Sequence, residues 1–431
     1  MTTSEPASCF IFIQLPSGEE VVCGRFAQEA LSTGGWRGQF VYARSYRERR
    51  DAVPIDPFGL PLEERTFETT DDDGVFGAIR DAAPDAWGRR VIEARLGSNA
   101  LQSEIDYLLN SPEDRAGALS FSRKNEPPPA VQRFNRVLDL AALQAAAEQI
   151  EAGGPFPRES TPQRQLAQLL EVGTSMGGAR PKNVVQDADG LWLAKFPMKG
   201  DRWNVPVVEA AMLDLARLCG VRSAEHRLEK VGGQAVLLVK RFDRAQHKDG
   251  SMRRARMVSA KTVLRANDSV TQRDRWSYLV LADELQRWAS DPAEDRRELF
   301  RRMVFNALIS NLDDHPRNHA LIAPRADWRL APAYDLVPSP VASADRRDLA
   351  LVIGLGGRWA NRGNLLSECE RFGFGVEEAG AVIDRMKKVV GARWKGLIEA
   401  HGGTSADVRA TASAFDYPGF DFELPPNGGD R

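Results

Sequence analysis

The residues best suited to chemistry lie in one nine-residue run, 311–319, which reads NLDDHPRNH. Asp313 and Asn318 are five positions apart in it, and Asp335 follows in the segment LAPAYDLVPS after a hairpin-sized insertion. In a phosphoryl-transfer site, an Asp in the first place accepts or orients the acceptor hydroxyl. An Asn five residues later and a second Asp then bind Mg²⁺ through hard oxygen ligands. The spacing therefore predicts the catalytic half of such a site.

Two other interpretations of this run stay open. The run follows a long apolar helix, so its polar residues are also typical of a solvated helix end with Asx turns. A zinc site is the weaker alternative, because Asp-x-His spacing without Cys or a third, remote His is not the pattern of a structural zinc site.

A phosphoryl-transfer site also needs groups that hold the nucleotide phosphates, and the upstream sequence offers candidates. The segment SMGGA at 175–179 can bring backbone N–H groups close to phosphate oxygens, although the Walker A pattern GxxxxGK[ST] is absent. Lys195 lies on a predicted strand, and Glu209 lies in the helix that follows. Taken alone, the glycines indicate a turn and the lysine an exposed strand edge. The order of these features along the chain is what favours phosphoryl transfer.

Three segments are expected to position these residues. The first, 1–125, reads as a β-rich module, with predicted strands at 9–15, 20–24 and 39–46 and helices at 75–79 and 87–96. The linker KNEPPP at 124–129 ends it, because consecutive prolines favour extended chain. The second segment, 130–245, has a predicted helix at 138–150, a hairpin at 183–196, a helix at 206–218 and strands at 227–230 and 235–240.

The third segment, 246–431, is predicted to be mainly helical, with helices at 275–288 and 376–401. Between these two, Asp291 as N-cap, Pro292 at the first helical position and Glu294 three residues after the cap mark the start of another helix. The apolar stripe of that helix is expected to comprise Leu299, Phe300, Met303, Val304, Ala307 and Leu308.

Composition and charge narrow the classes of protein to which this chain could belong. The 431 residues carry 58 Lys and Arg against 60 Asp and Glu, which argues against a dedicated nucleic-acid-binding protein because such a domain is strongly basic. The four cysteines stand far apart without a CxxC pair, so reduced thiols are expected. No signal peptide or membrane-spanning run is recognisable, and we expect a cytoplasmic protein.

Several segments together resemble the HipA family of bacterial serine/threonine kinases, the toxins of HipBA-type toxin–antitoxin modules. DAAPDAWGRR at 81–90 is similar to that family's D-x-x-P-D-x-W-G-R motif, and SMGGARPK at 175–182 matches the position of its phosphate loop. LAKFP resembles the strand with the ATP-binding lysine, and VKRFDR resembles the strand between the lobes. NLDDHPRNH and LAPAYD match the catalytic and metal-binding loops.

The resemblance implies an α+β fold with two protein-kinase-like lobes, a β-rich N-lobe and a helical C-lobe, preceded by an additional N-terminal β-rich module. It implies ATP and Mg²⁺ as cofactors, Asp313 as catalytic base, and Asn318 and Asp335 as metal ligands. The residues that it implies in ATP binding are Gly177, Gly178, Ala179, Arg180, Lys182, Lys195, Glu209, Lys240, Phe242, His315, Asn318 and Tyr334.

The resemblance also implies partners and regulation. The partner would be a helix-turn-helix, HipB-like antitoxin, with operator DNA bound only through it and no membrane involved. The substrate would be a protein such as an aminoacyl-tRNA synthetase. Ser175 is the candidate for autophosphorylation, since a phosphate there would repel those of ATP. Two departures, Arg180-Pro181 in place of the more usual Gln-Glu and the segment at 253–266, bear on phosphate contacts and substrate choice.

Two alternatives remain beside a toxin kinase. The chain could be a catalytically weak co-repressor that binds the antitoxin, or a kinase whose acceptor is a small molecule or a lipid. Every expected catalytic position is occupied, which favours an active enzyme.

Overall fold

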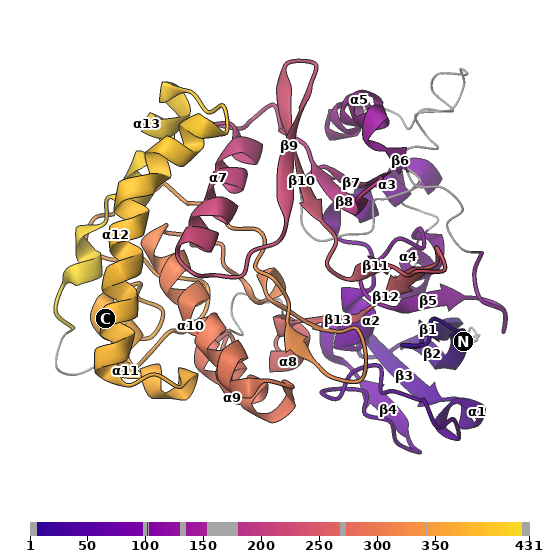
Figure 1. Ribbon diagram of the computed structural model, residues 1–431. Helices are drawn as coiled ribbons and strands as arrows, with labels where there is room; N and C mark the ends of the chain where they lie inside the picture. The colour runs from indigo at the N-terminus through magenta and orange to yellow at the C-terminus, as the bar shows by residue number, and fades with distance from the viewer. Residues whose placement is uncertain are drawn as a thin grey trace. The chain divides into compact units, whose positions relative to one another are not determined.

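The computed structural model describes residues 7–97, 101, 103–129, 135–152, 180–267, 273–340 and 343–424. The chain forms two compact units, which are described one at a time. Unit 1 comprises Met1–Met198, Lys240–Val258 and Ile322–Ala326, and unit 2 comprises Lys199–Val239, Ser259–Leu321 and Asp327–Arg431. The expected mixed α+β fold with a β-rich N-terminal module is confirmed (Figure 1).

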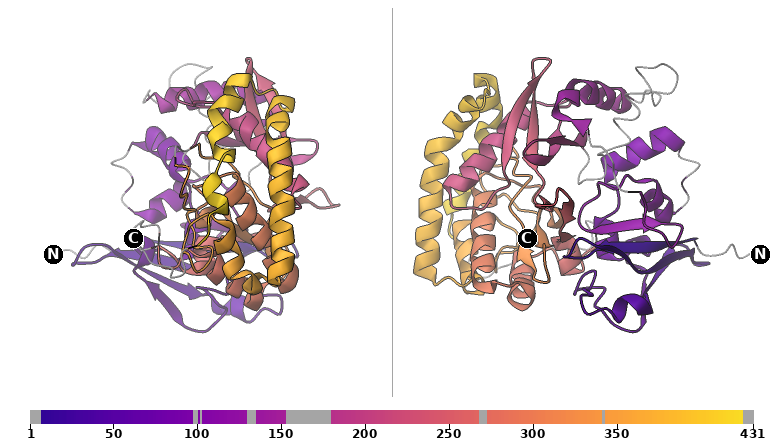
Figure 2. Two further views of the ribbon diagram at one scale, coloured as in Figure 1. Left: turned by 90° about the vertical axis from the view of Figure 1, so that its left-hand side faces the viewer. Right: turned by 45° about the vertical axis from the view of Figure 1, so that its right-hand side comes forward.

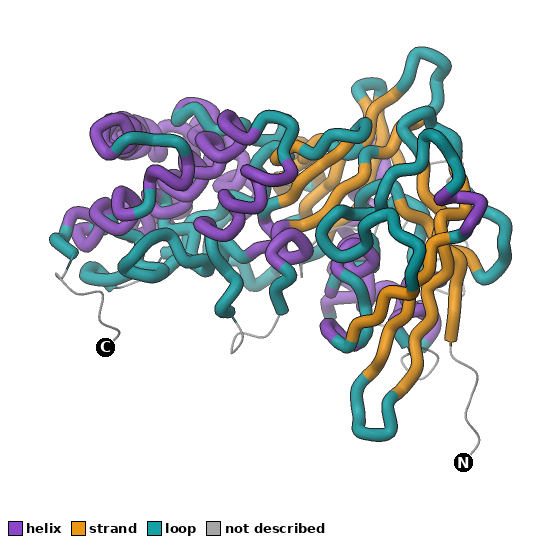
Figure 3. Tube along the Cα trace, turned by 90° about the horizontal axis from the view of Figure 1, so that it is seen from below, coloured by secondary structure: helices purple, strands orange, loops and turns teal. Residues whose placement is uncertain are grey.

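Unit 1 begins with a five-stranded antiparallel sheet of order β4-β3-β2-β1-β5. Strands are drawn in orange in Figure 3. Its strands are β1 (Ala7–Gln14), β2 (Glu20–Ala30), β3 (Trp36–Tyr42), β4 (Thr66–Thr69) and β5 (Leu119–Ser122). The register places Phe26 opposite Phe40 and Phe40 opposite Phe67, so one face carries a row of buried aromatic rings. Such cross-strand pairs are the main source of sheet stability.

The strand predicted at 39–46 is wrong in its second half. The strand β3 ends at Tyr42, and the short helix α1 (Arg44–Arg47) begins two residues later. Both tyrosines are buried, with the hydroxyl of Tyr42 donating to the carbonyl of Leu60 (2.5 Å) and that of Tyr46 to the carbonyl of Val53 (2.6 Å). Both tyrosines are therefore buried, although the backbone changes from strand to helix between them and leaves Arg44 exposed.

Several helices lie between β4 and β5 in the chain. They are η1 (Asp71–Asp73), α2 (Gly77–Asp81), α3 (Ala86–Leu96) and α4 (Glu104–Asn110). The predicted end of α3 at Gly97 is confirmed, since Gly97 has a φ of 86° and caps the helix. Farther along lie β6 (Asn135–Arg136), η3 (Val137–Asp139) and α5 (Leu140–Glu151), and α5 packs against Trp87 and Val91 of α3.

The predicted hairpin is present as the antiparallel strands β7 (Lys182–Asp187) and β8 (Gly190–Lys195), and β6 pairs with β7 in parallel. A second hairpin of unit 1 pairs β11 (Arg244–Gln246) with β12 (Met252–Arg254). The strands β13 (Arg256–Ser259) and β14 (Ala320–Ala323) each have residues in both units.

Unit 2 is mainly helical, and its longest helix is α12 (Figure 2). Its helices are α7 (Val205–Leu218), α8 (Ala260–Leu264), α9 (Tyr278–Trp288), α10 (Pro292–Leu308), η4 (Pro316–Asn318), α11 (Arg362–Ser367), η5 (Cys369–Phe372), α12 (Val376–Ala400), α13 (Ser405–Phe415) and η6 (Pro418–Asp421). Its strands include the antiparallel pair β9 (His226–Val231) and β10 (Gln234–Lys240), which ends at the unit border, and β15 (Arg329–Leu330).

The helix α10 forms the centre of unit 2 and carries the candidate catalytic loop at its end. Its predicted start is confirmed, because Asp291 accepts a hydrogen bond from the backbone N–H of Glu294 (3.2 Å) and Pro292 is the first helical residue. Phe300 and Met303 of the predicted stripe are fully buried, and so are Phe305 and Asn306 outside it. α10 is therefore covered on several sides, by α9 and α12 among others.

No helix within the described part of the chain is long and apolar enough to cross a membrane. The four cysteines are buried and free.

Candidate catalytic site

The run 311–319 forms a tight loop whose start is fixed by Ser310. This residue adopts a left-handed conformation, with a φ of 49°, immediately after α10. Its hydroxyl donates to the carbonyl of Ala414 (2.7 Å) and accepts from the guanidinium of Arg347 (2.8 Å). Non-glycine residues in this conformation persist only where the surroundings hold them, and they cluster at functional sites.

Hydrogen bonds inside the loop join Asp313 to Asn318. The backbone N–H of His315 donates to the carbonyl of Asp313 (2.8 Å), and the backbone N–H of Asn318 donates to the carbonyl of His315 (2.8 Å). The side-chain amide of Asn318 also donates to the carbonyl of Asp313 (3.0 Å). Because the amide nitrogen is used in this way, the amide oxygen of Asn318 is the atom suited to bind a cation.

Asp335 is held beside this loop by its neighbours. The hydroxyl of Tyr334 donates to the carbonyl of Arg317 (2.8 Å), which ties the segment to the loop. Asp335 has a φ of 58°, a second left-handed residue at the site. The structure thus brings together Asp313, Asn318, Tyr334 and Asp335, which the sequence analysis placed in one site.

The electrostatics of the loop show that Asp313 lies near other carboxylates. Loss of solvation raises the pKa of the Asp313 carboxyl above its ordinary value, although its side chain still reaches solvent. The carboxylates of Asp335 and Asp314 raise this pKa further, and His315 opposes them. A raised pKa strengthens the carboxylate as a base once it is ionised.

A buried polar network lies beneath the loop, and sequence reasoning missed it. The hydroxyl of Tyr278 donates to one carboxylate oxygen of Asp314, and the other oxygen lies 2.8 Å from Nε2 of His319. The amide of Asn306 on α10 donates to the same hydroxyl (3.1 Å). Tyr278 is fully buried, and burial raises its pKa well above the ordinary value. The network attaches the loop to α9 and α10.

His315, one of the residues implied in ATP binding, is half-buried and lies two positions after Asp313. Within the described part of the chain, its buried Nδ1 atom has no hydrogen-bond partner. Its influence on the site is electrostatic, because it lowers the pKa of the Asp313 carboxyl.

In unit 1, the segment DAAPDAWGRR supports the hairpin that carries Lys182. Asp85 caps α3 by accepting from the backbone N–H of Gly88 (2.6 Å), and its other oxygen lies 3.1 Å from Nζ of Lys182. The buried Trp87 ring donates to the carbonyl of Lys182 (2.9 Å). The motif therefore has a structural basis, and an ATP contact by Lys182 stays a prediction.

The segment after β10, which contains Phe242, is anchored to the N-terminal module of unit 1. Arg241 donates to the carbonyls of Asp114 (2.5 Å) and Arg115 (3.1 Å), and the backbone N–H of Gly117 donates to Asp243 (3.0 Å). Burial opposes ionisation of Asp243, but the guanidiniums of Arg241 and Arg244 outweigh it and hold the pKa of this carboxyl well below its usual range. Lys240 lies over the ring of Trp192, 5.5 Å from its centre.

The structure gives less information about the other residues that were predicted to bind the nucleotide. Lys195 ends β8, half-buried, and lies opposite Lys182 in the hairpin register. Glu209 is buried on α7 in unit 2, so its ion pair with Lys195 of unit 1 stays a prediction. Arg180 lies two residues before β7, whereas Ser175, Gly177, Gly178 and Ala179 lie outside the described residues.

Comparison with known proteins places these features in one family. The HipA-like C-terminal domain matches residues 174–394, and the HipA N-terminal domain matches residues 20–122. The candidate kinase Y4mE of Sinorhizobium fredii is 24% identical over 353 residues, which cover 75% of this chain and 76% of that protein. The candidate kinase Y4dM of the same organism is 33% identical over 162 residues, or 34% of this chain and 37% of that protein.

A solved structure has the same fold. A chain of the complex of HipA, HipB and operator DNA from Shewanella oneidensis MR-1 superposes with a TM-score of 0.67 at 17% identity, covering 96% of this chain and 98% of that one. The C-terminal domain match alone spans more than half of the 431 residues. The protein described here therefore belongs to the HipA family.

Proposed function

We propose that this chain is an ATP- and Mg²⁺-dependent serine/threonine protein kinase and the toxin of a toxin–antitoxin module. The observation that carries the proposal is the grouping of Asp313, Asn318 and Asp335 in unit 2, with Asn318 bonded to the Asp313 backbone and the Asp335 carboxylate raising the pKa of Asp313. Membership of the HipA family and two relatives named as candidate kinases support it.

The ligand atoms on this loop fit Mg²⁺. The amide oxygen of Asn318 and the carboxylate of Asp335 are hard oxygen donors, and Mg²⁺ usually takes one or two protein ligands while phosphates and water complete its shell. When bound, ATP would supply the phosphoryl group, and Mg²⁺ would supply positive charge that neutralises the phosphate oxygens. Asp313 orients the acceptor hydroxyl and accepts its proton. Lys195 is the residue proposed to bind the nucleotide phosphates, with Glu209 as its predicted ion-pair partner.

The fold comparison supports a proposal about the partner. Because the similar structure is that of HipA with HipB and operator DNA, we expect this chain to bind a helix-turn-helix antitoxin that supplies the contacts to DNA. The expected protein substrate is a component of translation such as an aminoacyl-tRNA synthetase. The division into an accessory module at 1–125, an N-lobe at 130–245 and a C-lobe at 246–431 likewise stays a prediction.

The direct test of the activity is transfer of labelled γ-phosphate from ATP to protein in a bacterial lysate. Asp313→Asn should reduce the initial rate by about 10²- to 10⁴-fold, the usual contribution of a general base. Asp327→Asn is the matched control, because Asp327 is an exposed carboxylate outside the loop. Equal labelling by the wild type and Asp313→Asn would exclude the assignment, and antitoxin binding without labelling would favour the co-repressor alternative.

Autophosphorylation needs its own experiment. After incubation of the wild type with Mg-ATP, we expect phosphate on Ser175 by peptide mass spectrometry, and its loss in Ser175→Ala. Ser160→Ala serves as a control from the same stretch of sequence. Phosphate on other residues of the wild type, with none on Ser175, would contradict this assignment while leaving the kinase proposal intact.

A further inference from the structure

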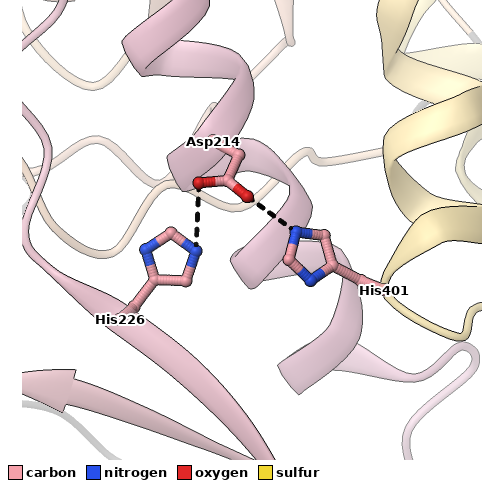
Figure 4. Close-up of side chains that lie close together, drawn as sticks. All are labelled: Asp214, His226 and His401. Atoms are coloured by element: carbon pink, nitrogen blue, oxygen red, sulfur yellow. Dashed lines mark hydrogen bonds and ion pairs between the residues drawn. The ribbon is translucent and has the colours of Figure 1, made fainter.

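Two histidines that are far apart in the sequence meet at one carboxylate in unit 2, away from the loop 311–319 in the sequence. Asp214 lies near the end of α7, His226 begins β9, and His401 caps the C-terminus of α12. Figure 4 shows the Asp214 carboxylate between the two imidazole rings. The side chain of His226 is 2% exposed, that of His401 is 23% exposed, and that of Asp214 is 34% exposed. The cluster is therefore mostly enclosed but within reach of solvent.

The donor atoms of these three side chains already lie close together. Nε2 of His226 lies 3.5 Å from Oδ1 of Asp214, and Nε2 of His401 lies 2.9 Å from Oδ2. A set of ligand atoms, one from each residue, lies within 4.8 Å of one another. In a tetrahedral zinc site with bonds of roughly 2.0–2.1 Å, ligand atoms are about 3.3 Å apart, so small side-chain adjustments would form one.

The hydrogen bonding of His226 leaves Nε2 as an acceptor. Its Nδ1 lies 3.3 Å from the carbonyl of Ala224, and since a carbonyl only accepts, this contact is a hydrogen bond in the tautomer that carries the proton on Nδ1. In the neutral ring, the lone pair of Nε2 then faces the Asp214 carboxylate, and two acceptors in contact repel each other. A cation between the two atoms removes the repulsion.

The surroundings of the cluster match those of metal ligands. Histidines that bind metals usually donate their other ring N–H to a carbonyl or carboxylate, as His226 does to Ala224. Ligating carboxylates are in turn hydrogen-bonded, and Arg217 donates to Oδ1 of Asp214 (3.2 Å). The positive charge of Arg217 also weakens the attraction of Asp214 for a cation. The affinity for a metal ion would therefore depend on the two imidazole ligands as well as on the carboxylate.

We propose that Asp214, His226 and His401 form a binding site for Zn²⁺, with a water molecule as the fourth ligand. Two imidazole nitrogens and one carboxylate oxygen suit a borderline transition metal rather than Mg²⁺, which prefers oxygen ligands. The ion would link α7, β9 and the C-terminal end of α12, three elements of one unit. Its expected role is structural, and it does not depend on the proposed kinase activity.

The test measures Zn²⁺ on the purified full-length chain without nucleotide. After chelator treatment and dialysis against Zn²⁺, the wild type should retain about one equivalent and should gain thermal stability, because an ion that binds only the native state raises its stability. His226→Gln, His401→Gln and Asp214→Asn should each lose the bound ion and the stabilisation. His247→Gln, at a half-exposed histidine of unit 1, and Asp335→Asn, in the candidate catalytic site, should keep both.

A measurement on the wild type alone guards against variants that fail to fold. With Co²⁺ in place of Zn²⁺, the wild type should show the visible absorption bands of a four-coordinate ion. A wild type without bound Zn²⁺ and without these bands would overturn the proposal and leave a hydrogen-bonded Asp–His pair. Retention of the ion by folded His226→Gln and His401→Gln would overturn it as well, because the metal would then lie elsewhere.

Discussion

At the scale of single residues, Asp313 is set apart by its surroundings. Its carboxyl shares a short stretch of chain with Asp314 and, through the tertiary fold, a site with Asp335. Like charges close together disfavour full ionisation, and partial burial adds to this effect. The raised pKa of the proposed base therefore comes from the groups around Asp313, and not from its being an aspartate.

This tuning predicts how activity depends on pH. A base works only when ionised, and the pKa of Asp313 is raised, so its ionised form is lost as pH falls through a value above the ordinary one of about 3.9. We expect the acid limb of kcat/KM to lie above that value. His315 lowers the pKa of Asp313, so His315→Gln should move the limb to still higher pH. An acid limb that stays in place in this variant would contradict the role of His315.

The buried network below the loop predicts that removal of the Tyr278 hydroxyl lowers the stability of the fold. Tyr278→Phe leaves the buried Asp314 carboxylate and Asn306 amide with one partner fewer, which should cost about 1–3 kcal/mol of stability and lower the urea midpoint of unfolding of the full chain. Tyr107→Phe is the matched control, since its hydroxyl bonds Glu93 near the surface. Equal losses of stability in the two variants would contradict a larger contribution of the buried network to stability.

At the scale of elements, local signals set where helices begin. Asp291 caps α10 through the backbone N–H of Glu294, and the same helix carries the candidate loop at its other end. Asp291→Ala should therefore destabilise the fold by about 1 kcal/mol, as measured by thermal unfolding, while Asp291→Ser, which can still cap, should have a smaller effect. A stability order with the serine variant below the alanine variant would contradict a capping role.

Elements also show where local signals are insufficient. The segment 39–46 was predicted to be one strand, yet β3 ends at Tyr42 and α1 begins at Arg44, and the buried Tyr42 and Tyr46 bond the carbonyls of Leu60 and Val53. Periodicity reports which side chains are buried, not which backbone conformation buries them. The hairpin of β7 and β8 was predictable, in contrast, because its turn and both strands are adjacent in sequence.

At the scale of the whole molecule, buried charges connect parts of the chain that are more than a hundred residues apart. Within unit 1, Arg241, Asp243 and Arg244 join the segment after β10 to residues 114–117 of the N-terminal module. Removing the carboxylate would leave two buried guanidiniums without their counter-ion, which typically costs about 3–5 kcal/mol.

This arrangement predicts a pH-dependent stability. The pKa of Asp243 is lower in the folded state, so its contribution is complete above the unfolded value of about 3.9 and is lost as pH falls toward the folded value. Asp243→Asn should lower the unfolding temperature at neutral pH, and the difference from wild type should shrink in acid. Asp348→Asn, at a partly exposed ion pair, should cost less than about 1 kcal/mol. A difference between wild type and Asp243→Asn that does not change with pH would contradict this account.

The sequence alone determined the helix cap at Asp291, the stop at Gly97, the hairpin turn and the order of the motifs, because each depends on residues that are near neighbours in the chain. Only the tertiary structure decided that Lys182 bonds Asp85 and that Tyr278 supports Asp314. It also brought His401 to Asp214, 187 positions earlier. These contacts follow from burial, which depends on how whole elements pack, and no local pattern of side chains encodes that packing.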